Sequence, residues 1–304
     1  MQKNRLLISG GLGFIFSYVT EYFVAKGWDV YVIDNLSTGS HREIIDGSFT
    51  FINADVSDSG IVGKILDIQP DYVIHAAACS CVDTSVNFPY YSFKNNAVAT
   101  MWIFEACRQL PNLKKLIYIA TDECYGECEY RKNERDILFP RNPYALSKAI
   151  GSLMRITYDS NFKELTNKTC ETRFCNIFGP RQDDRKIIPA IKRALDTGEP
   201  LDLHNGGTGY REWLYVKEIP LVMDLLLEKG NRVFNVTANN GYTVRELVDL
   251  AQHITGKKIK ITNGERKGMD LQYKMDAARI RELGWKSQYN FTKAFKAYVE
   301  NQAL

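Results

Sequence analysis

The first 34 residues contain the pattern that most restricts the fold of this chain. Leu6-Leu7-Ile8 is a short apolar run that leads into the glycines of Ser9-Gly10-Gly11-Leu12-Gly13. Apolar residues then recur at helical spacing as far as Gly27, and a second apolar run, 30–33, ends at Asp34. A strand, a glycine turn, a helix and a second strand that ends in an acidic residue are typical of a dinucleotide-binding βαβ unit.

Each part of this unit has a physical role in binding a dinucleotide. Glycines such as Gly10 and Gly13 let the backbone approach a pyrophosphate, and the following helix presents free N–H groups and a partial positive charge at its N-terminus. Asp34 can accept a hydrogen bond from a ribose hydroxyl. Because an acid at this position would repel the additional phosphate of NADP, the sequence predicts NAD as the cofactor. The predicted cofactor-binding residues are Gly10, Gly13, Phe14, Ile15, Asp34, Asn35, Asp55, Val56, Ala76, Tyr144 and Lys148.

One residue departs from the glycine pattern. The third glycine would fall at position 16, where this chain has Phe16. A glycine there permits close packing between the helix and the strand. Phe16 must therefore tilt the helix or fill a space that is left elsewhere.

Further strand patterns predict the fold class. Apolar runs at 49–52, 72–76 and 116–119 alternate with helical patterns, notably at 88–108. This alternation predicts an α/β fold with a doubly wound parallel sheet of the Rossmann type, whose ligands lie at the carboxyl ends of the strands. We expect residues 1–175 to form the NAD-binding domain and 176–304 a smaller, mixed α/β substrate domain. Part of 208–236 is a candidate to rejoin the first domain.

A short polar run follows the strand pattern at 116–119. Thr121, Asp122 and Glu123 should lie at the carboxyl edge of the sheet. Two adjacent carboxylates repel one another, and burial raises the pKa of a carboxyl group. One of the pair can then donate a proton while the other accepts one, as the elimination of water requires. The alternative is an ordinary polar strand end.

Tyr144 and Lys148 lie four residues apart on a helix that is predicted to begin after Pro143, so they share a face of that helix. The pKa of a free tyrosine is about 10. A lysine cation beside Tyr144, together with a positively charged nicotinamide, would favour the phenolate. Tyr144 could then remove a hydroxyl proton while a hydride leaves the same carbon, and Lys148 could hold the nicotinamide ribose. The alternative is a partly exposed aromatic residue beside a surface lysine.

Composition excludes several classes of function. A net charge of +3 on 304 residues, with scattered basic residues, does not indicate nucleic-acid binding. The chain has no run of about 18 apolar residues and no signal-peptide pattern, so we expect no membrane association. Its seven cysteines are irregularly spaced without a C-x-x-C pair, which favours reduced cysteines in a cytoplasmic protein over a disulfide framework or a metal site.

Across essentially its whole length the chain is similar to the extended short-chain dehydrogenases/reductases, and among these it resembles the dTDP-glucose and UDP-glucose 4,6-dehydratases. The motifs that carry the resemblance are Gly10-Gly11-x-Gly13-Phe14-Ile15, Asp34-Asn35-Leu36, Thr121-Asp122-Glu123-x-Tyr125-Gly126, Asn142-Pro143-Tyr144-Ala145-x-Ser147-Lys148, Arg173-x-x-Asn176, Arg211-x-Trp213 and Arg266-x-Gly268-x-Asp270. Thr-Asp-Glu is the discriminating element. Related decarboxylases and GDP-mannose dehydratases typically have Ser at the middle position, and 4-epimerases lack the acid pair.

The resemblance implies a redox-neutral cycle on a nucleotide-activated glucose. Tyr144 takes the O4 proton as the C4 hydride moves to NAD. Glu123 then removes the C5 proton while Asp122 protonates the departing O6 hydroxyl, which leaves as water. Hydride returns to C6, and Tyr144 or solvent supplies a proton at C5. Thr121 is expected to position the sugar near O4. The product would be a 4-keto-6-deoxy sugar nucleotide.

The resemblance also implies the substrate contacts and the assembly. Its nucleotide-sugar contacts correspond to Asn176, Lys186, Arg211 and Arg266, and cationic side chains suit a diphosphate. Pairing of the helices near 88–108 and 143–164 would give the homodimer common in this superfamily. Two alternative functions remain: another reaction on a nucleotide sugar, such as 4-epimerisation or decarboxylation, and a non-catalytic NAD-binding regulatory protein.

Overall fold

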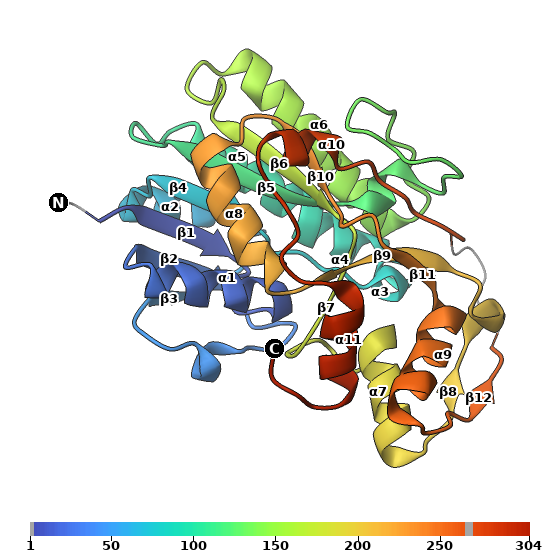
Figure 1. The fold of residues 1–304 in the computed structure, drawn as a ribbon. Coiled ribbons are helices and arrows are strands. Elements are labelled where there is room, and N and C mark those ends of the chain that lie inside the picture. Colours follow the sequence, from blue (N-terminus) through green and yellow to red (C-terminus); the bar gives the residue numbers. More distant parts are fainter. Residues whose placement is uncertain (1–2, 265–269) are drawn as a thin grey trace.

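The computed structural model describes residues 3–264 and 270–304. Its centre is a seven-stranded sheet in the spatial order β10-β6-β5-β4-β1-β2-β3, and every neighbouring pair of strands in it is parallel. The chain therefore starts in the middle of the sheet and winds outwards in both directions (Figure 1). The predicted doubly wound α/β fold is confirmed.

The strands of this sheet are β1 (Arg5–Ser9), β2 (Asp29–Asp34), β3 (Thr50–Asn53), β4 (Tyr72–His75), β5 (Lys115–Thr121), β6 (Thr169–Phe174) and β10 (Val233–Val236). The larger helices that cover it are α1 (Phe14–Ala25), α2 (Ile61–Ile68), α5 (Ala99–Cys107), α6 (Pro143–Asn161) and α8 (Glu218–Lys229). Shorter segments between them are η1 (Arg42–Ile44), α3 (Val82–Asn87), α4 (Pro89–Phe93), η2 (Lys94–Val98) and η3 (Asp122–Tyr125).

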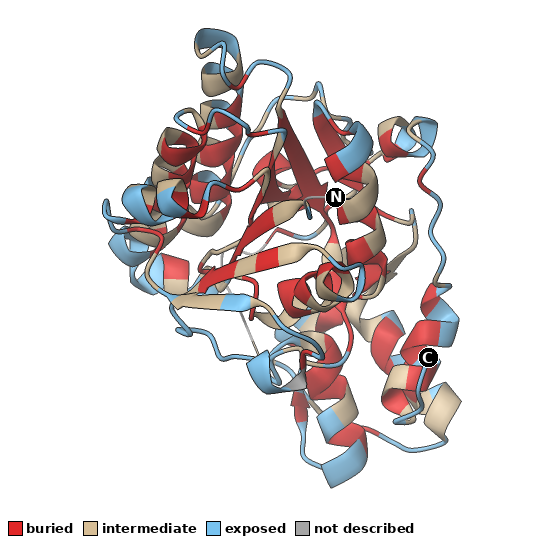
Figure 2. Ribbon diagram, turned by 90° about the vertical axis from the view of Figure 1, so that its left-hand side faces the viewer, coloured by how far each residue is buried: buried red, intermediate tan, exposed pale blue. Residues whose placement is uncertain are grey.

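Successive residues of a strand point to opposite faces of the sheet, and β1 shows how both faces are covered. Leu6 and Ile8 lie in the apolar cluster that includes residues of α1 and α8, whereas Leu7 lies in the cluster that includes residues of α2 and α5. All three side chains are fully buried. Figure 2 shows the same pattern at larger scale, with buried strands inside and exposed residues mainly on helices and loops. A continuous apolar strand is therefore what a parallel sheet covered on both faces requires.

The remaining elements form a smaller mixed α/β part. In its three-stranded sheet, β9 (Tyr210–Tyr215) pairs in parallel with β7 (Asn176–Phe178) and in antiparallel with β11 (Gly241–Thr243). The other elements are α7 (Ile187–Thr197), β8 (Leu201–Asp202), η4 (His204–Gly207), α9 (Val244–Thr255), β12 (Ile261–Thr262), α10 (Ala278–Glu282) and α11 (Phe291–Val299).

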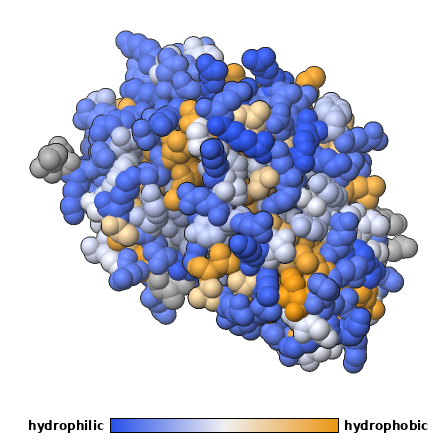
Figure 3. All heavy atoms as spheres, in the orientation of Figure 1, coloured by the Kyte–Doolittle hydropathy of each residue, from blue (hydrophilic) through white to orange (hydrophobic). Residues whose placement is uncertain are grey.

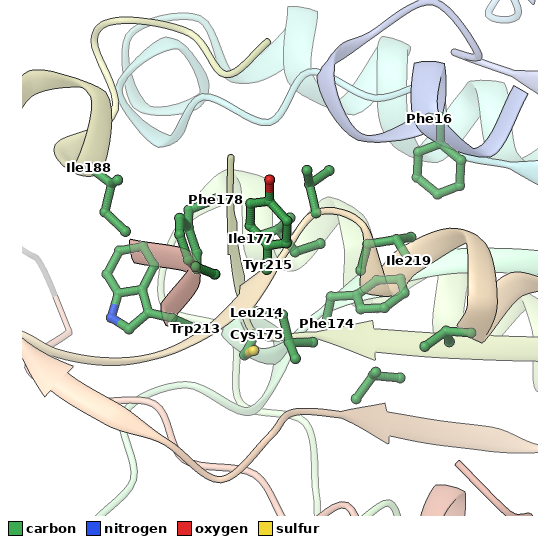
Figure 4. Packing of buried hydrophobic residues seen from close by; sticks show 14 of the residues in the cluster. Phe16, Phe174, Cys175, Ile177, Phe178, Ile188, Trp213, Leu214, Tyr215 and Ile219 are labelled. Carbon is green, nitrogen blue, oxygen red and sulfur yellow. The ribbon is translucent and has the colours of Figure 1, made fainter. Parts of the chain in front are cut away.

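Two elements from the 208–236 region lie with the large sheet. β10 pairs with β6, and α8 packs against α1. The division of the chain into domains at 175 and 176 stays a prediction, because one apolar cluster extends through both parts. Figure 4 shows Phe174, Ile177, Trp213 and Ile219 of this cluster close together.

Phe16 fills a place in that shared cluster. Its side chain is only 6% exposed, and Figure 4 shows it projecting from α1 toward the cluster. Close packing between α1 and the sheet depends instead on Gly11, where a Cβ atom would lie 2.9 Å from both Thr20 Oγ1 and Val32 Cγ1. The second of the two alternatives predicted for Phe16 is therefore the one observed.

None of the helices within 3–264 and 270–304 is both long and apolar enough to span a membrane. The face of the molecule drawn in Figure 3 is mostly hydrophilic, with apolar residues in small groups.

Replacing Phe16 by Gly should destabilise the protein without improving dinucleotide binding. The change removes a buried phenyl ring and places glycine inside a helix, which together should cost about 3–5 kcal/mol of unfolding free energy. Urea unfolding would measure this loss, with Phe16→Leu as a control that retains most of the apolar volume. The NAD affinity of the folded variant should equal that of the wild type, and a large gain in affinity would contradict this account of Phe16.

Candidate active site

The parallel register brings the carboxyl ends of neighbouring strands to one edge of the sheet. Ser9 of β1 is paired with Ile33 of β2 and with His75 of β4, and His75 is paired with Tyr118 of β5. The loops that follow these strands carry the predicted cofactor residues and the acid pair. The sequence prediction that these groups share one edge agrees with this register.

The turn between β1 and α1 is shaped to receive a negatively charged group. Gly10 has φ +73°, and a Cβ atom on it would lie 2.7 Å from Ala77 Cα. At Gly13 the carbonyl oxygen of Gly10, at 3.6 Å, is the one atom of the described residues near a Cβ position, so this side of the turn is open. In the part of the chain that the structure describes, no side chain caps the N-terminus of α1, which leaves the amide groups of Phe14 and Ile15 free of a capping side chain. This geometry fits the pyrophosphate of a dinucleotide.

Asp34 links the glycine turn to the end of β2. Its Oδ2 accepts a hydrogen bond from Leu12 N at 3.1 Å, and its Oδ1 accepts one from Leu36 N at 2.9 Å. Each carboxylate oxygen has a further lone pair. Asp34 can therefore accept from a ribose hydroxyl while it holds the turn in place.

The loop after β3 lies beside Asp34. Asn35 Nδ2 donates to Asp55 Oδ2 at 3.1 Å, and Asp55 Oδ1 accepts from Ser57 N at 2.8 Å. Burial acts to raise the pKa of Asp55, but the hydrogen bonds from Ser57 and Asn35 outweigh it and lower the pKa. Val56 is buried between these polar groups. The cofactor roles of Asn35, Asp55, Val56 and Ala76 stay predictions.

Thr121 begins the turn that carries the acid pair. It is the N-cap of η3: its Oγ1 accepts a hydrogen bond from Glu123 N at 3.4 Å and donates one to Asp122 Oδ1 at 3.1 Å. Thr121 is 8% exposed and Asp122 4% exposed. The turn therefore buries the carboxyl group of Asp122, whereas the next residue, Glu123, is partly exposed.

The two carboxyl groups differ in their surroundings. Burial, and then the charge of Glu123, raises the pKa of Asp122 to about 7. Burial also raises the pKa of Glu123, whereas a hydrogen bond from Asn142 and the cations Arg211 and Lys186 oppose that rise. Asp122 is thus suited to carry a proton near neutral pH, and Glu123 has partners that stabilise its charged form.

Asn142 joins the acid pair to helix α6. Its Oδ1 caps the helix by accepting from Ala145 N at 2.8 Å, and its Nδ2 donates to Glu123 Oε2 at 3.0 Å. Pro143 occupies the first turn of the helix, where its missing N–H is no loss. Asn142 was not among the predicted site residues. The Asn-Pro order at the start of a helix indicates a cap, but no sequence pattern indicates the bond to Glu123.

Tyr144 lies near Thr121 and both carboxyl groups of the acid pair. Burial and the nearby charges of Glu123, Cys124 and Asp122 raise its pKa well above 10, while a hydrogen bond with Thr121 acts in the opposite direction. Burial, and then the carboxyl groups that lie near the phenol, thus favour the protonated form of Tyr144. Any group that makes Tyr144 a base must offset these negative charges.

Lys148 lies one helical turn further along α6 and is 3% exposed. Its Nζ is 4.6 Å from the centroid of the Tyr118 ring. Burial lowers the pKa of Lys148 to about 8, against the smaller opposing effects of Cys124 and Glu171. The joint effect of Lys148 and a positively charged nicotinamide on the pKa of Tyr144 stays a prediction.

The predicted substrate residues approach the acids from the smaller part of the chain. Arg211 in β9 lies close enough to lower the pKa values of both Asp122 and Glu123, and Lys186 lowers that of Glu123. Lys186, just before α7, is exposed, and Asn176 begins β7. Arg266 lies outside the described residues. The assignment of these four residues to substrate binding stays a prediction.

Arg211 is held in place by the backbone and by a tyrosine. Its Nη2 donates to Asp270 O at 2.9 Å and its Nη1 to Leu271 O at 3.1 Å. The guanidinium carbon is 4.5 Å from the centroid of the Tyr273 ring, and Tyr273 OH donates to Asp270 Oδ2 at 2.6 Å. Tyr273 was not predicted, because only the folded chain brings residues 270–273 beside β9.

A buried ionic network supports the acid turn from behind. Tyr125 ends η3, and its hydroxyl accepts from Arg173 Nη1 at 2.6 Å and donates to Asn235 Oδ1 at 2.9 Å. Arg173 Nε lies 2.8 Å from Glu171 Oε1, and Arg155 Nε lies 3.3 Å from Glu171 Oε2. The turn is thereby connected to β6 and β10, which are neighbouring strands of the large sheet, and this restricts where Asp122 can lie.

His75 and Cys124, which lie near the site, are buried in environments that keep both side chains uncharged. His75 is buried, with Nδ1 2.7 Å from Ser9 Oγ and Nε2 3.0 Å from Thr100 Oγ1, and burial lowers its pKa to about 3. Cys124 is fully buried, and burial raises the pKa of its thiol to about 12. The imidazole of His75 is therefore neutral and the thiol of Cys124 protonated near pH 7.

Known proteins were compared with the whole chain. A family model described as GDP-mannose 4,6 dehydratase matches residues 7–298. The low-salt glycan biosynthesis protein Agl12 of Haloferax volcanii is 30% identical, and the alignment covers 97% of each chain.

Solved structures with the same fold include enzymes named for different reactions. The UDP-glucose 4-epimerase of Thermotoga maritima, solved with UDP-glucose, superposes with a TM-score of 0.90 at 28% identity and covers 97% of both chains. The dTDP-glucose 4,6-dehydratase DesIV of Streptomyces venezuelae, solved with NAD bound, gives a TM-score of 0.89 at 27% identity, over 97% of this chain and 96% of that one. The fold alone does not distinguish the two reactions.

The burial of Asp122 should make the protein less stable as the pH rises. Its folded pKa of about 7 lies above the ordinary value of 3.8, so the folded state binds the extra proton and loses stability between about pH 4 and pH 7. Asp122→Asn removes this penalty. Relative to the wild type, the variant should gain on the order of 2–3 kcal/mol of unfolding free energy between pH 4.5 and pH 8.

Urea unfolding at the two pH values would measure this gain. Asp67→Asn, at an exposed carboxyl group, is the matched control and should show no comparable pH-dependent gain. An Asp122→Asn variant that behaves like this control would show that the carboxyl group is not held in its protonated form.

Proposed function

The chain belongs to the GDP-mannose 4,6 dehydratase family, a group of extended short-chain dehydrogenases/reductases for which NAD is the cofactor, and we propose that it dehydrates a nucleotide-activated glucose. The proposed substrate is UDP-glucose or dTDP-glucose, and the proposed product is the 4-keto-6-deoxy sugar nucleotide. The observation that carries the proposal is a buried Asp122 beside Glu123, with Tyr144 facing both.

Elimination of water from C5 and C6 requires one group that accepts a proton and one that donates it. Glu123 is the proposed base at C5, because Asn142, Arg211 and Lys186 stabilise its negative charge. Asp122 is the proposed acid at the O6 hydroxyl, because its raised pKa of about 7 keeps a proton available at neutral pH. A 4-epimerisation needs neither group.

Tyr144 is the proposed base at O4. Two carboxyl groups oppose loss of its phenolic proton. Protonation of Asp122 removes one of these negative charges, so the form of Asp122 that can act as an acid also favours a negatively charged Tyr144. Thr121, which contacts both Tyr144 and Asp122, is the proposed positioning group for the O4 region.

NAD, when bound, supplies a hydride acceptor for C4 and the hydride that returns to C6. The chain would hold it with the open glycine turn, the free amides of α1 and the carboxylate of Asp34. Lys148 is the proposed contact to the nicotinamide ribose. Lys186, Arg211 and Arg266 are the proposed cationic contacts to the nucleotide diphosphate, and Asn176 is a further proposed contact to the nucleotide sugar.

Product mass tests the proposed reaction. Purified protein is incubated separately with UDP-glucose, dTDP-glucose and GDP-mannose, without added reductant. Loss of one water from either glucose nucleotide is the expected result. The faster of the two reactions would show whether the protein prefers uracil or thymine as the nucleobase. A 4-epimerase would leave the mass unchanged but alter the sugar, and a protein that binds NAD but changes none of the sugar nucleotides would support a regulatory protein. Loss of water from GDP-mannose alone would contradict the substrate assignment.

Two substitutions separate the proposed chemical steps. Tyr144→Phe should lower kcat by about 10²–10⁴-fold, the typical contribution of general acid–base catalysis, and leave the Kd for the sugar nucleotide within a few-fold of the wild-type value. Glu123→Gln should slow elimination to a similar extent but permit the first oxidation, so that absorbance at 340 nm rises and persists. Rapid-mixing absorbance measures the oxidation, and product mass measures the elimination.

The exposed Tyr130 provides a control for the phenol. Tyr130→Phe removes a hydroxyl group from a side chain that is 62% exposed and should retain full activity. Near-normal turnover by Tyr144→Phe, or an unchanged elimination rate in Glu123→Gln, would remove that residue from its assigned role.

The second proposal concerns assembly: the chain forms a homodimer through α3, α4 and α6. α3 and α4 pack against α6, and this region exposes a group of large apolar side chains. Its members are Val86, Phe88, Tyr90, Tyr91, Leu146, Leu153 and Ile156. An exposed apolar group of this size favours burial against another surface, and a second copy of the chain supplies a self-complementary one.

Leu153→Glu should convert the dimer into a monomer, because it places a charge in the middle of the proposed interface. Light scattering after size-exclusion chromatography would give the mass of each species. Ile137 is also exposed but lies outside this group, so Ile137→Glu is the matched control and should remain dimeric. A wild-type protein that is monomeric at micromolar concentration would contradict the assembly.

A further inference from the structure

Lys148 is a buried ammonium group with an unusual set of neighbours. No carboxylate among the described residues forms an ion pair with it, although only 3% of the residue is exposed. The nearest carboxylate named among its electrostatic partners is Glu171, which is engaged by Arg155 and Arg173. A buried cation without a paired anion requires some other stabilising contact.

Tyr118 in β5 supplies contacts at both ends of this lysine. The face of its ring lies toward the ammonium group, with Nζ 4.6 Å from the ring centroid. Its hydroxyl donates to the backbone carbonyl oxygen of Lys148 at 2.9 Å. One fully buried side chain therefore contacts both the backbone and the charged end of Lys148.

Gly151 makes this close approach feasible. A Cβ atom at Gly151 would lie 2.2 Å from the Tyr118 hydroxyl oxygen and 2.3 Å from Cζ. Any larger residue would have to displace the tyrosine or move α6 away from the sheet. Gly151 and Tyr118 thus pack directly against each other, and this contact sets the distance between α6 and β5.

We propose that Tyr118 is a positioning residue for Lys148, and that its aromatic ring stabilises the buried ammonium beside Tyr144 without neutralising it. A carboxylate in this place would pair with the lysine and cancel its positive charge. The ring attracts the cation through its quadrupole and carries no net charge. The charge of Lys148 therefore remains available to the ligand and to Tyr144. This inference rests on the proposed function of Lys148.

The other groups that face Lys148 are few. Cys124 of η3 and Glu171 of β6 act on its pKa, and Lys148 in turn contributes to the lowered pKa of His75 in β4. His75 is neutral near pH 7 and the Cys124 thiol is protonated, as described above. Tyr144 lies on the same helix. Of these groups, the ring of Tyr118 is the one with a close contact to Nζ that the structure records.

Fluorination of the aromatic ring at position 118 tests the proposal with little change in the shape of the ring. Tyr118 is replaced by phenylalanine and by 3,4,5-trifluorophenylalanine, which has a similar size but a much weaker negative face. The affinity for NAD is then measured by calorimetry between pH 6.5 and pH 9.5. Retention of the fold is checked by thermal unfolding of each variant. Tyr118→Leu gives a further variant that lacks the ring.

With phenylalanine, the dependence of NAD affinity on pH should match that of the wild type, because the ring remains. With the fluorinated ring, the ammonium should lose its proton more easily, so NAD affinity should begin to fall about 0.5–1 pH unit lower. The dehydration kcat should fall on the alkaline side by a corresponding shift, with little change in KM at pH 6.5. Identical pH profiles for the phenylalanine and fluorinated variants would overturn the proposal and leave Tyr118 a packing residue.

The product-mass assay and the NAD titrations test the proposed function and this inference separately. A wild-type protein that binds NAD but removes water from no sugar nucleotide would contradict the dehydratase. The NAD titrations would still decide whether the Tyr118 ring supports Lys148.

Discussion

The parallel register of the seven-stranded sheet is the constraint on which the site depends. Because neighbouring strands run in the same direction, the glycine turn after β1, the acidic end of β2 and the Thr121 turn after β5 all lie at one edge. Helix α6 packs against β5 and β6, which brings Tyr144 and Lys148 to the same place. The smaller part of the chain then adds Arg211 and Lys186 near the acids. No single segment contains the site, but the register leaves little freedom in where its pieces meet.

This arrangement holds a carboxyl group where it is costly to ionise. Asp122 is buried next to Glu123, and its pKa is raised to about 7. The turn is retained because Thr121 caps it and because Tyr125 is bonded to Arg173 and Asn235. In the proposed reaction, the stability lost by burying the acid provides the proton donor at neutral pH, which is the form of trade-off expected at a catalytic site. Lys148 shows the same principle with the opposite charge, since burial lowers its pKa to about 8.

The sequence was sufficient to predict the parts of the structure that depend on local pattern. Strand and helix alternation predicted the doubly wound sheet, and the ends of strands predicted which residues share its edge. Contacts between distant segments were not predictable in this way. Asn142 could be expected to cap a helix, but its bond to Glu123 depends on the path of residues 124–141. The Tyr118 ring beneath Lys148 depends on the packing of α6 onto β5. The surroundings of Tyr144 were also not predictable, because sequence spacing does not show that the carboxyl groups of Asp122 and Glu123 lie near the phenol. The position of the Phe16 side chain was likewise not predictable, because several elements together form the apolar cluster in which it lies.

Transfer of deuterium within the substrate tests the central claim most directly. The protein is incubated with UDP-glucose or dTDP-glucose that carries deuterium at C4, and the product is examined by mass spectrometry and NMR. The account predicts a product that has lost one water and carries the deuterium at C6, with one solvent proton taken up at C5. Deuterium that stays at C4 in a product of unchanged mass would contradict it, because the acid pair would then have no role in the reaction.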